Sequence, residues 1–107
     1  MIFTLLLAAT LAQSPADVFT LRCSGCHAPD NNKEGPRLRG VYGRNAASAP
    51  GFDYSEALKK SKIQWDDFTL DQWLRNPDAL VPDTDMAFRL TDAEERKIII
   101  AYLKHLK

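Results

Sequence analysis

Cys23-Ser24-Gly25-Cys26-His27 is the most informative run of residues in this chain of 107 residues. Two cysteines separated by two residues and followed at once by a histidine form the attachment pattern of c-type haem. With this spacing both thiols reach the two vinyl groups of one porphyrin, and the adjacent His27 turns its imidazole toward the iron as proximal ligand. The sequence therefore predicts one covalently bound haem c.

Three other interpretations of the two cysteines are weaker. Structural zinc needs four tetrahedral ligands, whereas the chain has two cysteines and two histidines, with His105 alone near its end. A thioredoxin-like redox pair is expected beside a βαβ pattern, which this sequence does not show. A disulfide between cysteines three positions apart would close a small, strained loop. Haem is the preferred interpretation.

The composition fits a small domain built around a cofactor. After the first twelve residues, the chain is near the size at which a core needs help from a metal, a disulfide or a cofactor. Fourteen basic and fourteen acidic residues give a formal net charge of zero, so no strong field indicates nucleic acid or an anionic membrane. We expect one monomeric domain over 13–107 with no nucleic-acid partner.

The first twelve residues, MIFTLLLAATLA, differ in character from the rest. Their apolar run ends in Thr10-Leu11-Ala12, which is similar to the cleavage end of a secretory signal peptide. The run has no Lys or Arg before it, and it is too short to span a bilayer as a helix. We interpret 1–12 as a truncated signal peptide or an N-terminal anchor. The protein is then expected in the periplasm, either soluble or anchored, and touching a membrane only through its partners or an uncleaved N-terminus.

The remaining sequence predicts an all-α fold of four to five helices with long loops around the haem. Ser14 before Pro15 begins a helix over 15–23, and a short helix is expected over 55–60. Capping boxes that open at Thr69 and Thr91 predict helices over 69–76 and 92–107. The buried face of the last helix follows the i, i+3, i+4, i+7 pattern, with Ile99, Tyr102, Leu103 and Leu106.

The segment 25–51 contains all five glycines and three of the six prolines, so regular structure is not expected there. A loop of this length normally argues against a compact domain. A loop that wraps around a cofactor would explain this length.

Met86 is the candidate for the sixth iron ligand. Apart from Met1 it is the only methionine, and it follows the polar run Pro82-Asp83-Thr84-Asp85 rather than lying in an apolar stripe. A methionine more often fills a core, but a thioether is also a soft ligand that favours ferrous iron and raises the reduction potential. His105, beside Lys104, is the alternative ligand and is expected to be solvated.

Several further segments occur in a recognisable order. They are GPRLRGVYGR from Gly35, APGFDYS from Ala49, IQW ending at Trp65, TLDQWLRNP from Thr69, VPDTDMAF from Val81, and IAYLK near the end. Together with CSGCH, they make the chain resemble the cytochrome c family, in its small, soluble, single-haem form (class I, mitochondrial-like). The resemblance covers 19–103 and implies the cytochrome c fold. The loop from His27 to Pro36 is shorter than in mitochondrial members, which favours a bacterial origin.

The resemblance also implies roles for individual residues. Cys23 and Cys26 would form the thioethers, and His27 and Met86 would be the two axial ligands. The carbonyl of Pro36 would accept the proton on the other His27 ring nitrogen and fix its tautomer. The remaining assignments are Arg44, Tyr54 and Trp65 on the propionates, and Trp73, Thr84 and Asn76 in the network around the distal ligand. A propionate away from water needs a cationic partner, which supports Arg44 independently.

With both axial positions filled, no coordination site remains for O2 or peroxide. The expected function is therefore one-electron transfer between Fe2+ and Fe3+ in a respiratory chain, without enzyme activity. The resemblance implies larger redox proteins as partners, with a cytochrome bc1 complex or a dehydrogenase as donor and a terminal oxidase or reductase as acceptor. Two alternatives remain: a cytochrome subunit tethered to one dehydrogenase or oxidase complex, and a haem enzyme such as a peroxidase.

The chain also departs from the family pattern. Asp78, Asp83 and Asp85 stand where lysines usually surround the distal loop, so the docking face is expected to be neutral or acidic. Leu58 replaces an asparagine that bonds a propionate, and Trp73 replaces a tyrosine whose hydroxyl reaches the methionine sulfur. Further departures include Pro15, which replaces a small glycine where the first and last helices meet.

Overall fold

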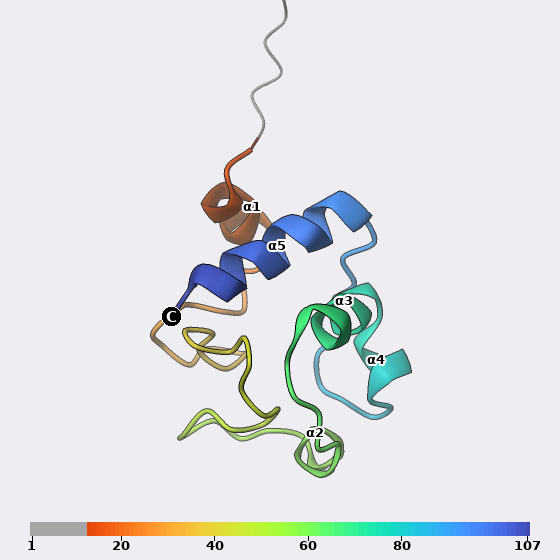
Figure 1. Ribbon diagram of the computed structural model, residues 1–107. Coiled ribbons are helices and arrows are strands. Elements are labelled where there is room, and N and C mark those ends of the chain that lie inside the picture. The colour runs from red at the N-terminus through yellow and green to blue at the C-terminus, as the bar shows by residue number, and fades with distance from the viewer. Residues whose placement is uncertain (1–12) are drawn as a thin grey trace, which may run out of the picture.

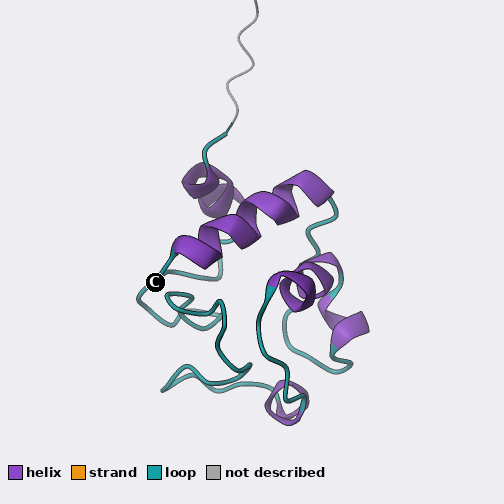
Figure 2. Cartoon of the chain, in the orientation of Figure 1, coloured by secondary structure: helices purple, strands orange, loops and turns teal. Residues whose placement is uncertain are grey.

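The computed structural model describes residues 13–107, and this part of the chain folds into five helices joined by long loops (Figure 1). The helices are α1 (Pro15–Arg22), α2 (Glu56–Lys60), α3 (Asp67–Arg75), α4 (Pro77–Leu80) and α5 (Ala93–His105). Over this range the β structure is limited to one isolated bridge between Asn45 and Gln64, and Figure 2 shows helices and loops alone. The predicted all-α class is confirmed.

α1 begins where the sequence predicts and ends at the haem motif. Ser14 has an extended backbone, and its hydroxyl accepts a hydrogen bond of 3.2 Å from the backbone N–H of Asp17. Pro15 fills the first helical position, where no backbone donor is needed. The helix ends at Arg22, so Cys23 is its C-cap and donates its N–H to the carbonyl of Phe19.

α1 crosses α5, and this crossing fixes the N-terminal side of the site (Figure 1). Val18 and Phe19 of α1 are buried, and the rings of Phe19 and Tyr102 lie 4.8 Å apart between centroids. Arg22 bonds Glu95 of α5 through a charged pair at 3.0 Å. The proline at position 15 therefore does not prevent the contact between the first and last helices.

α3 and α5 begin at different residues from those expected. α3 starts at Asp67 because Asp66 is its N-cap: the Asp66 carboxylate accepts the N–H of Thr69 at 2.8 Å, and the Thr69 hydroxyl accepts the N–H of Asp66 at 2.9 Å. Thr69 thus closes a capping box instead of opening one. In α5 the N-cap is Asp92, which accepts from the N–H of Glu95 at 3.0 Å.

α4 is a helix that the sequence analysis did not include. Asn76-Pro77 does end α3, as expected, but the same two residues begin the next helix. The side-chain oxygen of Asn76 accepts the N–H of Ala79 at 3.4 Å, and Pro77 occupies the first position. An Asn–Pro pair can both stop one helix and cap another.

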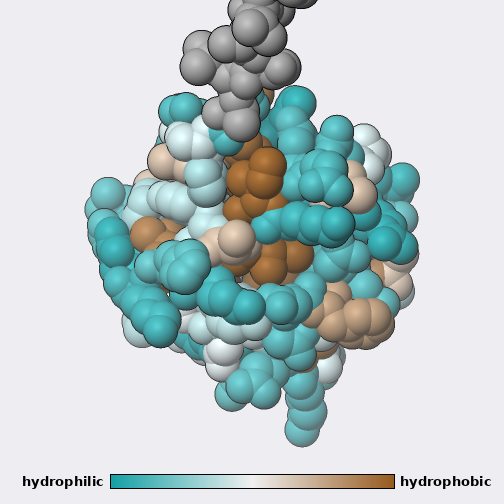
Figure 3. All heavy atoms as spheres, turned by 45° about the horizontal axis from the view of Figure 1, so that its top comes forward, coloured by the Kyte–Doolittle hydropathy of each residue, from teal (hydrophilic) through white to brown (hydrophobic). Residues whose placement is uncertain are grey.

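The buried core runs along α1, α3 and α5, and Val18, Ile99 and Pro77 are its most completely buried large side chains. On the face shown in Figure 3, hydrophilic side chains surround a group of hydrophobic ones near the centre. Within 13–107, no helix is both long and apolar enough to cross a membrane. The predicted signal peptide or anchor over 1–12 lies outside the described residues.

Candidate functional site

One cavity collects the site residues that the sequence predicts. Its volume is about 470 Å³, within the range that is typical of ligand and cofactor sites. Its walls come from α1, α2, α3 and α5 and from the loops that contain 23–55, Trp65 and 84–88. Apolar side chains dominate these walls. The lining includes ten of the eleven residues with predicted roles: Cys23, Cys26, His27, Pro36, Arg44, Tyr54, Trp65, Trp73, Thr84 and Met86. Asn76 and His105 are not part of the lining, and His105 is exposed.

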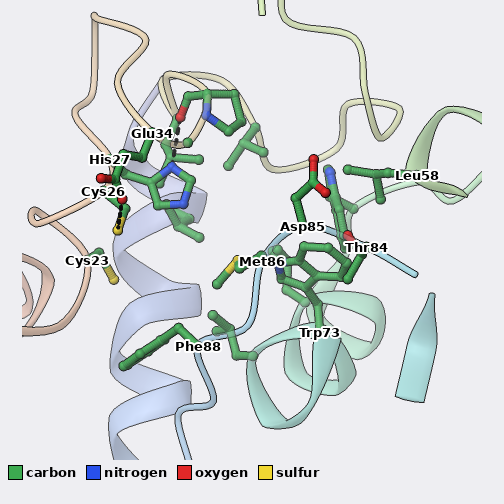
Figure 4. Close-up of a pocket in the computed structure, with 18 of the residues that line it drawn as sticks. Cys23, Cys26, His27, Glu34, Leu58, Trp73, Thr84, Asp85, Met86 and Phe88 are labelled. Carbon is green, nitrogen blue, oxygen red and sulfur yellow. Dashed lines mark hydrogen bonds between the residues drawn. The ribbon is translucent and has the colours of Figure 1, made fainter. Parts of the chain in front are cut away.

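The two cysteines lie where α1 opens into the first long loop (Figure 4). No disulfide joins them, so both sulfurs remain available for attachment to a cofactor. Burial raises the pKa of the Cys23 thiol to about 11. The exposed Cys26 thiol donates a hydrogen bond of 3.3 Å to the Glu34 carboxylate, and this bond raises the pKa of Cys26. No motif in the sequence marks Glu34 as part of this site.

His27 is held in one orientation by the loop that follows it. Its Nδ1 lies 2.8 Å from the carbonyl oxygen of Pro36, which can only accept, so Nδ1 carries the ring proton and Nε2 keeps a free lone pair. Burial lowers the pKa of His27 while the Pro36 bond partly opposes that change, so the imidazole stays neutral. A Cβ at Gly35 would overlap the His27 ring, and only glycine fits there.

Met86 enters the cavity from the opposite side, from the loop between α4 and α5 (Figure 4). The indole N–H of the buried Trp73 donates to the Met86 sulfur across 3.1 Å. Trp65 supports that indole in an edge-on contact, with ring centroids 5.3 Å apart. The tryptophan that replaces the family's tyrosine therefore still brings a donor to the sulfur.

The Arg44 end of the cavity offers hydrogen-bond donors without an acceptor. The Nε of Arg44 is buried and has no hydrogen-bond partner among the described residues, although its Nη1 donates to the carbonyl of Arg39 at 3.2 Å. The Tyr54 hydroxyl accepts the N–H of Ala49 at 3.0 Å, which leaves its own proton available. A buried donor without a partner costs about 1–3 kcal/mol. An anionic group in the cavity would remove that cost.

The family model for cytochrome c matches residues 13–107. The chain belongs to the cytochrome c family. It is 43% identical over 93 residues to a cytochrome c of Gibberella zeae, with 83% of this chain and 88% of that protein covered. It is 41% identical over 99 residues to a cytochrome c of Euglena viridis, with coverage of 90% and 97%.

A solved structure agrees with this assignment. Cytochrome cH from Methylobacterium extorquens aligns with a TM-score of 0.79 and 42% identity, covering 84% of this chain and 93% of that one. As a cytochrome c, the protein carries one covalently attached haem c with its iron, and it is an electron carrier rather than an enzyme. The peroxidase alternative is therefore removed.

The cavity fits that cofactor on grounds of its own. The orphaned Nε of Arg44 suits a carboxylate of the haem, and the absent side chain at Gly35 leaves room for the proximal imidazole. Within 13–107, no group of three or more His, Cys, Asp or Glu side chains is arranged to hold a metal ion, so the zinc interpretation finds no ligand set there.

Proposed function

We propose that this cytochrome c passes single electrons through an iron held between His27 and Met86, with Cys23 and Cys26 as the thioether attachments. The supporting observation is that His27 and Met86 enter one cavity from opposite sides, each fixed by a hydrogen bond to Pro36 or from Trp73. When bound, haem c supplies one iron that alternates between Fe2+ and Fe3+. His27 and Met86 would both be ligands of that iron.

The two ligands have complementary tasks. His27 offers the lone pair of Nε2 because Pro36 holds the proton on Nδ1, and that bond also increases the basicity of the ring. Met86 offers a soft thioether, which favours the ferrous state and gives a higher potential than a second histidine would. With no open position, the protein transfers electrons without binding O2 or peroxide.

The rest of the cavity binds and shields the cofactor. Arg44, Tyr54 and Trp65 would hydrogen-bond the propionates, and Thr84 would complete the distal network. The buried indoles of Trp65 and Trp73 exclude water from the distal wall. Groups that the fold holds in place in this way would reorganise little when the charge on the iron changes.

The proposal extends to location and partners. The apolar run over 1–12 supports export to the periplasm, where a monomeric protein would exchange electrons with a dehydrogenase or cytochrome bc1 complex and with a terminal oxidase or reductase. A tethered subunit of one such complex is the second candidate. N-terminal sequencing of the mature protein separates the two: a start near Gln13 supports the free carrier, and a retained Met1 supports the tethered subunit.

The axial ligands are tested by visible spectra of both redox states with a redox titration. Met86→Ala should open the sixth position, so imidazole binds and the potential falls on the order of 100 mV, within the roughly 0.8 V range that axial ligands set. Met86→His is the matched control: it refills the position, so imidazole is excluded although the potential still falls. An unchanged potential in Met86→Ala without imidazole binding would show that Met86 is not a ligand.

A further inference from the structure

The loop that carries Met86 has few bonds of its own. Over 85–89 the backbone makes no hydrogen bond to any other described residue. The last backbone bond before this stretch joins Thr84 N–H to Val81 O at 3.3 Å, and the next joins Leu90 N–H to Leu74 O at 2.7 Å. The position of Met86 therefore depends on Trp73 at its sulfur and on the anchors at the two ends of the stretch.

The downstream anchor is reinforced by Arg96 from α5. The Arg96 side chain is 7% exposed, and its Nη1 donates to the carbonyl oxygens of Leu90 at 3.0 Å and Thr91 at 2.9 Å. Its Nε donates to the carboxylate of Asp71 at 2.8 Å. One guanidinium thus connects the end of the loop to α3, and no other side chain within 13–107 donates to either carbonyl.

We propose that the Asp71–Arg96 pair positions Met86, by fixing the end of its loop against the helix that carries Trp73, and so controls how readily the sulfur leaves the iron. This inference rests on the proposed ligation by His27 and Met86. Arg96 and Asp71 touch neither ligand, so both are positioning residues.

The geometry of α3 makes the three anchors act together. Asp71, Trp73 and Leu74 lie within four residues of one helix, and they hold Arg96, the Met86 sulfur and the Leu90 N–H respectively. The four residues from Met86 to Leu90 can span at most roughly 14 Å. If Leu90 is released, the free stretch that carries Met86 becomes longer, and the sulfur can move farther from the iron.

Removing the carboxylate should release the anchor because Arg96 is buried. A buried charge that loses its partner is strongly destabilising, so the guanidinium must turn toward water and abandon the Leu90 and Thr91 carbonyls. Lysine cannot replace it, because an ammonium group lacks the planar set of donors that serves three acceptors at once.

The same Asp71 carboxylate also pairs with Arg75 at 3.2 Å, but the Arg75 side chain is 63% exposed. Arg75 therefore provides a matched control.

The test is imidazole binding to the ferric holoprotein, because imidazole reaches the iron only after the sulfur has left. We expect Asp71→Asn and Arg96→Lys to bind imidazole at least about tenfold more tightly than the wild type, and to lose the far-red absorption of a methionine-ligated ferric haem more readily. Arg75→Gln, which removes the exposed partner of the same carboxylate, should bind as the wild type does. Asp71→Glu, which keeps the charge, should bind imidazole with an affinity closer to that of the wild type than to that of Asp71→Asn.

Equal imidazole affinity in Asp71→Asn and Arg75→Gln would overturn the inference, even if Asp71→Asn unfolds at lower denaturant. If the variants do not fold, hydrogen exchange in the wild-type holoprotein decides: imidazole should speed exchange of the Leu90 amide but not of the Ile99 amide. Equal protection of Leu90 with and without imidazole would also overturn it. A wild-type spectrum without methionine ligation would instead refute the proposed function.

Discussion

Trp73, which stands where the family pattern has a tyrosine, is the residue that contacts the Met86 sulfur. Its N–H lies 3.1 Å from the Met86 sulfur, and its ring is 8% exposed, so the contact is shielded from water. A donor at a thioether withdraws electron density from the sulfur and weakens it as a ligand for Fe3+ more than for Fe2+. With Met86 as an iron ligand, as proposed, this hydrogen bond should favour the ferrous state and raise the reduction potential.

Trp73→Phe keeps an aromatic ring in the wall but removes the donor. A hydrogen bond contributes about 1 kcal/mol net, which corresponds to roughly 40 mV for one electron, so the potential should fall by tens of millivolts. A redox titration measures the change, and denaturant unfolding shows whether the fold is kept. A potential equal to the wild type in a folded variant would mean that the indole N–H does not act on the sulfur.

At the residue level, the sequence indicates side chains that the structure brings to one cavity. Ten of the eleven residues with predicted roles line it, and for Cys23, Cys26, His27 and Met86 the expected haem chemistry fixes the residue type. The contacts between carboxylates and distant partners were missed. Glu34 meets Cys26 and Asp71 meets Arg96 across 8 and 25 positions, and no local pattern marks either pair. Such contacts exist only once the helices and loops are placed.

Among the features of the helices, the first residue of each helix is the one that the sequence predicts least well. Two candidate capping residues lie near each of two helix starts, and the N-caps are Asp66 and Asp92 rather than the expected Thr69 and Thr91. A carboxylate combines the capping hydrogen bond with a favourable charge at the positive end of the helix. α4 was not expected for a similar reason. Asn76-Pro77 indicates the end of α3, but the same pair also begins α4.

Asp66→Ala tests the cap of α3. The Thr69 bonds lower the pKa of Asp66, so the folded state holds this carboxylate ionised more strongly than the unfolded chain does. A lowered pKa gives stability that is present above the unfolded value near 3.8 and is lost as the pH falls through the folded value. The variant should therefore unfold at lower denaturant at neutral pH, and its deficit should shrink in acid.

Urea unfolding of the holoprotein from neutral to acid pH measures this difference. Asp53→Ala, which removes an exposed aspartate that caps no helix, is the control for the loss of one charge. A deficit for Asp66→Ala that stays constant with pH would show that the ionised cap does not stabilise α3.

For the molecule as a whole, the haem accounts for the long loops. Without a filling group, a cavity of about 470 Å³ at roughly 24 cal/mol per Å³ costs on the order of 10 kcal/mol, comparable with the full stability of a small domain. Residues of the loops over 25–51 and 82–89 line this space. The same loops also have exposed residues at the surface of the molecule.

The surface beside Met86 carries unpaired acids. Asp78, Asp83 and Asp85 are exposed, and none of these carboxylates joins an ion pair within the described chain. Asp85 also lines the cavity. Arg89 is the one basic residue between 78 and 92 in the sequence. Because charges around a docking site chiefly set the association rate, this face should favour basic partners.

The double variant Asp83→Asn and Asp85→Asn tests this preference. Asn tolerates the positive φ of 68° at position 83, so the backbone is kept while two charges are removed. Electron transfer to a cationic inorganic oxidant should slow several-fold at low ionic strength, and transfer to an anionic one should speed up. Both differences should vanish near 1 M salt, where the screening length is about 3 Å. Asp17→Asn with Asp53→Asn removes the same charge away from the cavity lining, and an equal response of the two pairs would show that net charge, not the surface beside Met86, selects the partner.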